Sequence, residues 1–269
     1  MLNNIERVMI AAHRGRAGGN IPCNTTPAFE AALCEGADII ELDVSVSADR
    51  ELFVFHPGME KSHLKSEKMI IDMPSCEVKK LRYVNQDDTE TQFGVELFSD
   101  VMRNLKGRCI VNIDKFWTAP KEISEAIRNL GMTEQVIIKT YQDINDLKNV
   151  EKYAPDFPYM PMIIEKDECM DIIRKMDINC IGAEVCFKSE NSEVCSDEFV
   201  EKMHASGYKL WSDAIVYDYK SVIGAGHNDD MAVSGNFDDS WGWHIKKGFD
   251  IIQTDWPGML KRYLDSLGK

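Results

Sequence analysis

The stretch 36–57, GADIIELDVSVSADRELFVFHP, decides the expected architecture, because it places two acids inside an apolar, β-prone run. Glu41 and Asp43 are two residues apart, so on a strand both side chains point to the same face. Two carboxylates on one face are costly unless cations or hydrogen bonds hold them. Residues 48–50 are expected to turn the chain back, which brings His56 roughly opposite Asp43 in an antiparallel hairpin. Paired carboxylates beside an imidazole indicate a metal-assisted hydrolytic site.

Around this hairpin, β-prone and helical segments alternate along the chain. Apart from the returning strand of the hairpin, the expected strands are 8–12, 39–44, 109–114, 136–140, 159–164, 180–185, 209–212 and 251–254. The expected helices are 26–35, one that ends near 105, 119–130, 143–153, 168–175, 197–206, 241–247 and 258–267. This alternation predicts an α/β fold, a single TIM (β/α)₈ barrel over residues 1–269 with a small insertion or cap at about 45–95, after the second strand. A doubly wound open sheet is the alternative, but the sequence has no glycine-rich dinucleotide loop to support it.

Composition and charge restrict the partners. The formal net charge of −14 argues against a nucleic-acid partner, because phosphate backbones require a basic face. No signal peptide is evident and no apolar run approaches the length of a membrane span, so we expect no stable membrane insertion and a cytoplasmic location. The eight cysteines are scattered without a CxxC pair, which favours reduced thiols over disulfides or a zinc site. The oligomeric state stays open.

Polar residues gather where the expected strands end, which is where the active sites of such barrels lie. They are His13 and Arg14 after the first strand, Glu41 and Asp43 on the second, Asp114 and Lys115 at the third, Lys139, Glu184, and Thr254–Asp255 at the last. The opposite ends of the strands carry no comparable set. A small-molecule site at the carboxyl ends of the strands is therefore expected.

Three stretches of the chain together resemble one enzyme family. Residues 12–57, AHRGRAGGNIPCNTTPAFEAALCEGADIIELDVSVSADRELFVFHP, resemble the opening of glycerophosphodiester phosphodiesterases, and VNIDK (111–115) and GFDIIQTDWPGML (248–260) extend the similarity. The resemblance implies a TIM barrel that binds a phosphodiester with the help of a divalent cation, Mg²⁺ or Ca²⁺. It implies His13 and His56 as the general acid and base, and Arg14 as a phosphate contact. Glu41, Asp43 and Asp114 would bind the cation, and an all-oxygen ligand set independently favours a hard cation over zinc.

The chain departs from the family pattern at three positions. Cys23 replaces the glutamate of the PENT motif, and Pro57 replaces the aspartate after the second histidine. Lys115 directly follows Asp114, whereas the family lysine lies two residues on, so a regular strand would direct Lys115 to the other face. Lys139 is therefore the candidate to supply the missing cation, with Lys115 as the competitor.

Two further residues are candidates for the substrate pocket. Glu184 is expected either to line it or to pair with a cation, and Trp211 either to stack on the alcohol of the substrate or to pack at the top of the barrel.

The sequence thus favours metal-dependent hydrolysis of glycerophosphodiesters to an alcohol and glycerol 3-phosphate. A non-catalytic phosphate-ester binding barrel is one alternative, motivated by the acids missing at Cys23 and Pro57. Lysophospholipase D-type cleavage is another, which requires room for an acyl chain. The sequence leaves open the alcohol, the metal, and whether water or a hydroxyl of the substrate attacks the phosphorus.

Overall fold

Eight parallel strands close into a barrel in the computed structural model, which describes residues 7–218 and 220–268. The order of pairing is β1-β2-β7-β8-β9-β10-β11-β12, and β12 pairs again with β1. The predicted TIM barrel is confirmed. The strands are β1 (Met9–Ala12), β2 (Ile39–Val46), β7 (Ile110–Asp114), β8 (Val136–Tyr141), β9 (Tyr159–Ile164), β10 (Gly182–Cys186), β11 (Lys209–Asp213) and β12 (Ile251–Thr254).

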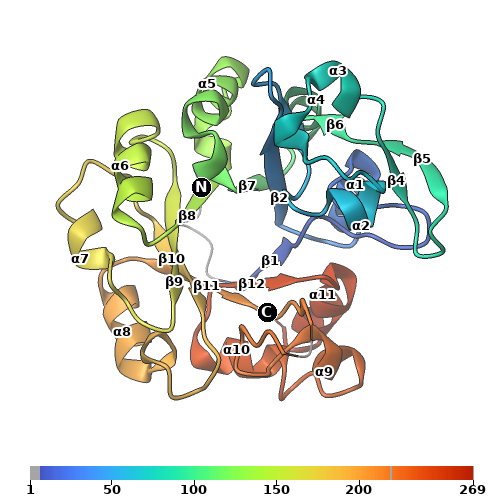
Figure 1. Cartoon of the computed structure of the whole chain (residues 1–269). Coiled ribbons are helices and arrows are strands. Elements are labelled where there is room, and N and C mark those ends of the chain that lie inside the picture. The colour runs from blue at the N-terminus through green and yellow to red at the C-terminus, as the bar shows by residue number, and fades with distance from the viewer. Residues whose placement is uncertain (1–6, 219, 269) are drawn as a thin grey trace.

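Helices surround the barrel on the outside (Figure 1). They are α1 (Thr26–Cys34), α4 (Phe98–Leu105), α5 (Pro120–Leu130), α6 (Ile144–Tyr153), α7 (Met170–Ile173), α8 (Asp197–Ala205), α9 (Asp229–Val233), α10 (Trp241–Lys247) and α11 (Pro257–Ser266). Local signals set several of their ends. The Asp143 carboxylate caps α6 by accepting from the backbone N–H groups of Asn145 and Asp146, and α5 begins at Pro120 and ends at the left-handed Gly131.

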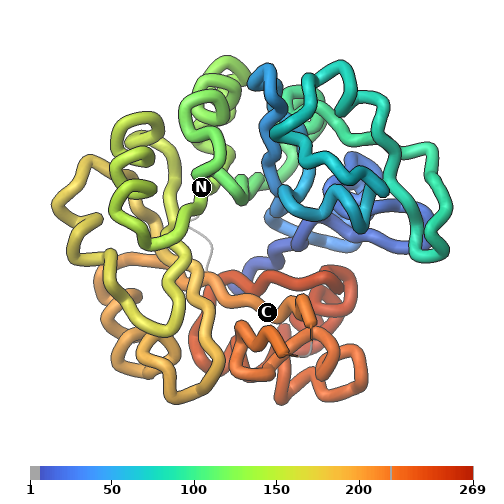
Figure 2. The backbone as a smooth tube through the Cα atoms, in the orientation of Figure 1, coloured from blue at the N-terminus to red at the C-terminus, as the bar shows by residue number. Residues whose placement is uncertain are grey.

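The excursion between β2 and α4 forms a compact lobe beside the barrel. β3 (Leu52–Val54) returns antiparallel to β2, and β6 (Glu96–Leu97) pairs with β3. Between them lie α2 (Glu60–Leu64), η2 (Ile70–Asp72), α3 (Ser75–Val78) and the hairpin of β4 (Arg82–Val84) and β5 (Glu90–Gly94). The lobe has an apolar cluster of its own that includes Phe55 and Tyr83. Its backbone stands to one side of the barrel (Figure 2).

The inside of the barrel changes character along its axis. Its lower layer is apolar and consists of Met9, Ala11, Ile39, Ile110, Ile137, Met160, Trp211 and Ile251. Two residues further along the same strand faces, the side chains become polar: Glu41, Asn112, Lys139, Asp213 and Gln253, all buried. This change from apolar to polar within single strands builds the floor of a site at their carboxyl ends.

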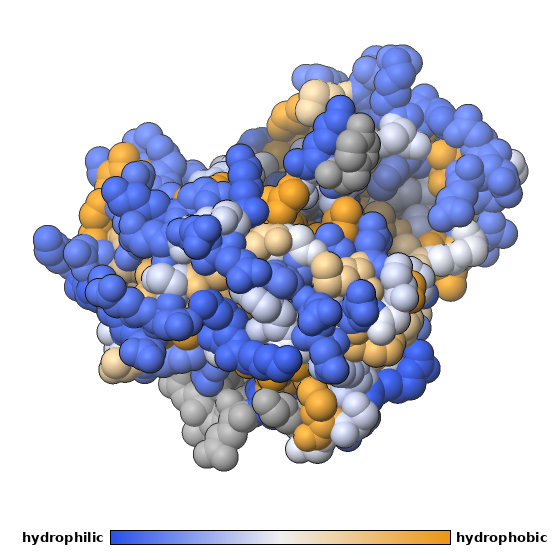
Figure 3. Space-filling view, turned by 90° about the horizontal axis from the view of Figure 1, so that it is seen from below, coloured by the Kyte–Doolittle hydropathy of each residue, from blue (hydrophilic) through white to orange (hydrophobic). Residues whose placement is uncertain are grey.

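The outer surface is predominantly hydrophilic on the face shown in Figure 3, in keeping with the excess of acidic residues. Among the described helices there is none with the length and apolar character needed to cross a membrane.

Candidate active site

Three carboxyl groups from two adjacent strands meet at the mouth of the barrel. Glu41 and Asp43 lie on the inner face of β2, and the parallel register places Asp43 beside Asp114 at the end of β7. One oxygen from each of the three carboxyl groups lies within 4.8 Å of the others. Glu41 and Asp43 are buried, and Asp114 is partly exposed. The sequence placed all three acids at the carboxyl ends of expected strands, and the family resemblance grouped them as cation ligands.

Burial and crowding give the two acids of β2 opposite protonation behaviour. Burial, reinforced by the negative charge of Asp43, raises the pKa of Glu41 to about 7. Burial also acts to raise the pKa of Asp43, but the positive charges of Arg14 and Lys115 outweigh it and lower the pKa to about 2. Within the described part of the chain, Oδ1 of Asp43 accepts no hydrogen bond, although it is fully buried. The cluster is therefore an electron-rich site that a cation would stabilise.

The loop after β1 wraps around these carboxylates. The backbone N–H of Arg14 donates to Glu41 Oε2 at 2.7 Å, and the Arg14 Nε lies 2.9 Å from Asp43 Oδ2. The amide of Asn24 donates to the same Asp43 oxygen at 2.8 Å. The turn requires Gly15, whose φ is +77° and whose missing Cβ would lie 2.7 Å from the carbonyl carbon of Ala28. Asn24 was not among the expected site residues, although it is the third residue of the PENT-like motif.

The two candidate lysines occupy different places. Lys115 leaves β7 in a left-handed conformation, with φ 61°, and its ammonium turns back to lie 2.7 Å from Asp114 Oδ2 and 3.5 Å from Asp43 Oδ1. Lys139 is only 2% exposed and forms an ion pair with Glu184. Lys115 is thus the lysine that contacts the acidic cluster. The expectation that it would point to the other face assumed a regular strand, but β7 ends at Asp114, so the alternation of strand side chains does not extend to Lys115.

Both histidines lie at the same mouth. His13 follows β1, and its Nδ1 is 2.9 Å from Oδ1 of Asp255, which follows β12. The hydrogen bond to Asp255 and the charge of Glu41 overcome the effect of burial and raise the pKa of His13 above its usual value. His56 lies at the end of the returning hairpin strand, with its Nε2 3.9 Å from Asp43 Oδ1, so the predicted opposition of His56 and Asp43 is present. Burial lowers the pKa of His56 despite that neighbouring carboxylate.

Each of the two imidazoles has a hydrogen-bond partner, although the chain lacks the acidic residues that the family has at positions 23 and 57. The Nδ1 of His56 lies 2.8 Å from the carbonyl oxygen of Pro57, so a backbone group orients this ring where the family has an aspartate. The carboxylate of Asp255, one of the polar residues expected at the end of the last strand, orients the ring of His13. Burial raises the pKa of the Cys23 thiol to about 11, so the side chain at this position is neutral beside Arg14.

A cavity of about 190 Å³ extends from the acidic cluster across the barrel mouth. His13, Glu41, Asp114 and Lys115 line one part of it. Its remaining wall is built by the ends of β8 to β12 and the loop after β11, and includes the exposed rings of Tyr141 and Tyr217.

Lys139 and Glu184 line this cavity, whereas Trp211 lies one layer deeper in the barrel. Trp211 is fully buried, and the Lys139 ammonium lies 3.7 Å from the centroid of its ring. This placement favours the packing interpretation of Trp211 over stacking on a substrate.

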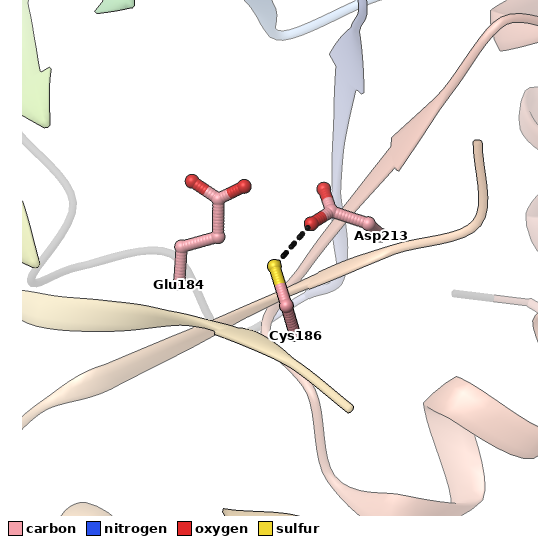
Figure 4. A group of neighbouring side chains, drawn as sticks. All are labelled: Glu184, Cys186 and Asp213. Atoms are coloured by element: carbon pink, nitrogen blue, oxygen red, sulfur yellow. Dashed lines mark hydrogen bonds between the residues drawn. The ribbon is translucent and has the colours of Figure 1, made fainter. Parts of the chain in front are cut away.

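A second group of side chains lies at the far end of the cavity, at β10 and β11. Glu184, Cys186 and Asp213 converge with one potential ligand atom each within 4.8 Å, and the Cys186 thiol lies 3.3 Å from Asp213 Oδ2 (Figure 4). Gln253 donates from Nε2 to Asp213 Oδ1 at 2.9 Å. Of these four residues only Glu184 was expected from the sequence. Polar residues at alternate positions of otherwise apolar strands were the available signal for Asp213 and Gln253.

Relatives of known sequence match large parts of the chain. Residues 159–264 match the model of a family described as a domain of unknown function, DUF4996. The uncharacterized protein YqiK of Bacillus subtilis is 28% identical over 229 residues, which cover 81% of this chain and 91% of that protein. A glycerophosphodiester phosphodiesterase of Caldanaerobacter subterraneus is 29% identical over 163 residues, covering 55% of this chain and 64% of the relative.

Solved structures share the architecture at lower identity. A glycerophosphoryl diester phosphodiesterase from Parabacteroides distasonis superimposes with a TM-score of 0.77 at 19% identity, covering 97% of this chain and 88% of that one. A phosphodiesterase from Oleispira antarctica, solved in complex with the product sn-glycerol-3-phosphate, has a TM-score of 0.69 at 16% identity, with 96% of each chain covered. The resemblance to the glycerophosphodiester phosphodiesterase family that the sequence motifs indicate is thus confirmed, in sequence through these relatives and in the barrel fold that the chain shares with them.

Proposed function

We propose that this protein is a metal-dependent phosphodiesterase that hydrolyses glycerophosphodiesters to an alcohol and glycerol 3-phosphate. One observation carries the proposal: the Glu41, Asp43 and Asp114 carboxyl groups lie within 4.8 Å of one another, with His13 and His56 at the same barrel mouth. The relative from Caldanaerobacter subterraneus carries the name of this activity, and the Oleispira antarctica structure contains its product.

The chemistry of the donors fits a hard divalent cation. Glu41, Asp43 and Asp114 offer carboxylate oxygens, which Mg²⁺ and Ca²⁺ prefer, and Oδ1 of Asp43 is buried with no hydrogen bond from any described residue. These three residues would hold the ion. Once bound, the ion would neutralise phosphate charge and polarise the phosphorus–oxygen bonds.

The chain's own cations would bind the phosphate from either side of the cluster. Arg14 is fixed by its contact with Asp43 and presents a planar guanidinium suited to phosphate oxygens. The Lys115 ammonium lies within 3.5 Å of two of the proposed metal-binding acids, so it would meet a phosphate oxygen bound next to the same ion.

The histidines would handle the two proton transfers. His13 lines the cavity and is held by Asp255, so we assign it as the acid that protonates the departing alkoxide. His56, whose Nδ1 is held by the Pro57 carbonyl, would accept the proton of the attacking hydroxyl or water through Nε2. Both imidazoles are oriented by a hydrogen bond, which general acid–base catalysis requires.

The test is glycerol 3-phosphate release from a panel of glycerophosphodiesters, with added Mg²⁺ or Ca²⁺ and with a chelator. We expect turnover that depends on the metal, and a loss of at least about 10²-fold in both His13→Ala and His56→Ala. His204→Ala, which changes a histidine on α8 away from the cavity, is the matched control. Metal-bound protein that cleaves no diester but still binds glycerol 3-phosphate would identify a binding barrel in place of an enzyme.

The rim of the cavity favours one variant of this activity as a second candidate. Tyr141, Ile164, Tyr217 and Val222 all line the cavity and are between 37% and 56% exposed, which is unusual for large apolar side chains gathered at one site. Such a rim would accommodate an acyl chain, as lysophospholipase D-type cleavage requires. Release of choline from lysophosphatidylcholine at a rate similar to that from glycerophosphocholine would support this variant, and no release would exclude it.

A further inference from the structure

The far end of the catalytic cavity contains a buried polar group that the proposed chemistry does not use. We call Glu184, Asp213 and Gln253 the distal subsite; all three line the cavity and each is at most 4% exposed. The amide of Gln253 donates to Asp213 through Nε2, but its Oε1 is buried and accepts no hydrogen bond from the residues described. A buried acceptor without a donor is costly, and this one belongs to a side chain that lines the cavity.

The charge of the distal subsite is balanced without a ligand. Lys139, which is 2% exposed, pairs with Glu184 and so accounts for one of the two carboxyl groups. One oxygen of Glu184 and one of Asp213 lie within 4.8 Å of each other, and two buried carboxyl groups so close to each other and to one ammonium do not both ionise at neutral pH. Burial and the negative charge of Glu184 accordingly raise the pKa of Asp213 well above its usual value. The Lys139 ammonium, the Glu184 carboxylate and the neutral Asp213 carboxylic acid together carry a net charge of zero.

A neutral subsite that offers hydrogen-bond acceptors favours uncharged hydroxyl groups over cationic groups. A trimethylammonium or primary ammonium group would approach Lys139, a like charge, without an uncompensated carboxylate to hold it. Hydroxyl groups, in contrast, donate hydrogen bonds without adding charge, so they can donate to Gln253 Oε1 and to the carboxyl groups of Glu184 and Asp213. A second metal ion at Glu184, Cys186 and Asp213 would face the same ammonium.

Resting on the proposed function, we propose that the distal subsite binds the alcohol arm of the diester and selects an uncharged polyol, such as glycerol, over a cationic headgroup such as choline. The alcohol arm is the relevant one because His13, which would protonate the departing alkoxide, lines the same cavity as the distal subsite. The side-chain oxygens of the subsite would replace the water that solvates the hydroxyl groups of the free substrate.

The first measurement compares kcat/KM for glycerophosphoglycerol and glycerophosphocholine, which differ only in the alcohol arm. We expect the ratio to favour the polyol by at least about 10-fold, the effect of one buried hydrogen-bonding group left without a partner. Glycerol 3-phosphate release from either diester reports separately whether the protein is a phosphodiesterase, whichever group attacks the phosphorus. A protein that cleaves both diesters but prefers glycerophosphocholine, or shows no preference, would overturn the polyol proposal and leave the proposed function standing.

Two variants change the ratio in ways that a merely structural role would not. Gln253→Met removes the free acceptor while keeping the volume, and is expected to lower the ratio about 10-fold. Lys139→Met removes the repelling ammonium and leaves the carboxyl groups of Glu184 and Asp213 to hold a cation, so the ratio should move at least about 10-fold toward choline. Gln92→Met, on the exposed face of β5, is the control for the first substitution. Equal losses for both substrates in Gln253→Met would show that the subsite does not distinguish the alcohol arm, and would overturn the proposal.

Direct binding gives a readout independent of turnover. Saturation-transfer NMR with free glycerol and with choline chloride should show contact for glycerol that is lost in Gln253→Met, with circular dichroism confirming that the variant is folded. Preferential contact with choline would overturn the proposal even if the protein cleaved no diester at all.

Discussion

Lys115 provides a test in which two measured quantities should move in opposite directions. Its ammonium lies 2.7 Å from Asp114 Oδ2 and 3.5 Å from Asp43 Oδ1, two of the proposed metal ligands. A single positive charge and a divalent cation about 4 Å apart would repel by roughly 8 kcal/mol at the effective dielectric constant of a protein surface. In the unmodified protein the long lysine side chain can rotate away from the ion and relieve most of this repulsion. We therefore expect the free energy of metal binding to be more favourable in Lys115→Met by about 1.4–2.8 kcal/mol, which is about 10- to 100-fold tighter binding of Mg²⁺ or Ca²⁺.

Turnover of the same variant should fall. Removing the ammonium removes a positive charge from the phosphate site, and loss of one such electrostatic contact costs about 10²–10³ in kcat. Titration calorimetry gives the metal affinity and glycerol 3-phosphate release gives the rate. Lys121→Met, an exposed lysine on α5, is the control and should change neither. Metal binding that is weakened or unchanged in Lys115→Met, or turnover near that of the unmodified protein, would refute the assignment of Lys115 to this site.

Three further predictions concern the cluster, the acid stability and the barrel closure. Asp43→Asn removes a carboxylate that is fully buried in the cluster, and calorimetry should show Mg²⁺ or Ca²⁺ affinity reduced by at least about 10-fold, whereas unchanged affinity would contradict the ligand set. Burial lowers the pKa of His244 to about 4, below its unfolded value of 6.5, so the folded state binds fewer protons and stability is lost as the pH falls from 6.5 towards 4. The loss amounts to about 3 kcal/mol in urea unfolding, and His244→Gln should flatten this slope; an unaltered slope would show that other groups cause it. Gly182→Ala would place a Cβ 2.0 Å from the carbonyl oxygen of Lys209, so we expect about 2–4 kcal/mol of destabilisation in the same assay, and a variant as stable as the parent would show that β10 and β11 can separate freely.

The sequence predicted most of the barrel because its strands and helices carry strong local signals. The apolar runs around Tyr159–Ile164 and Ile251–Thr254 are bounded by turn residues, and both strands occur with the expected bounds. Where the local sequence signals are weak, the expected bounds of a helix differ more from those in the structure. The expected helix at 168–175 is the four-residue α7, Met170–Ile173, because few of its positions face the core.

Contacts between distant strands were harder to foresee from one sequence. Glu41, Asp43 and Asp114 could be grouped because all three lie at the ends of expected parallel strands, which meet at one face of a barrel, and because the family resemblance marked them as ligands. The position of the Lys115 ammonium did not, because it depends on a single residue with positive φ after the end of a strand. Asp213 and Gln253 were not predicted as site residues for a related reason. Their place in the cavity depends on Lys139 and Glu184, which lie on other strands.

The hydrogen bond between His13 and Asp255 joins residues 242 positions apart, across the seam where β1 meets β12. A chain emerging from the ribosome makes His13 long before it makes Asp255. The strand β12 that closes the barrel ends at Thr254, directly before Asp255. A nascent chain can therefore assemble the carboxylates of β2 and β7 well before it can orient the imidazole of His13. Catalytic competence would arise only after β12 and Asp255 have been made, and chains truncated before β12 would remain inactive even if their remaining strands were paired.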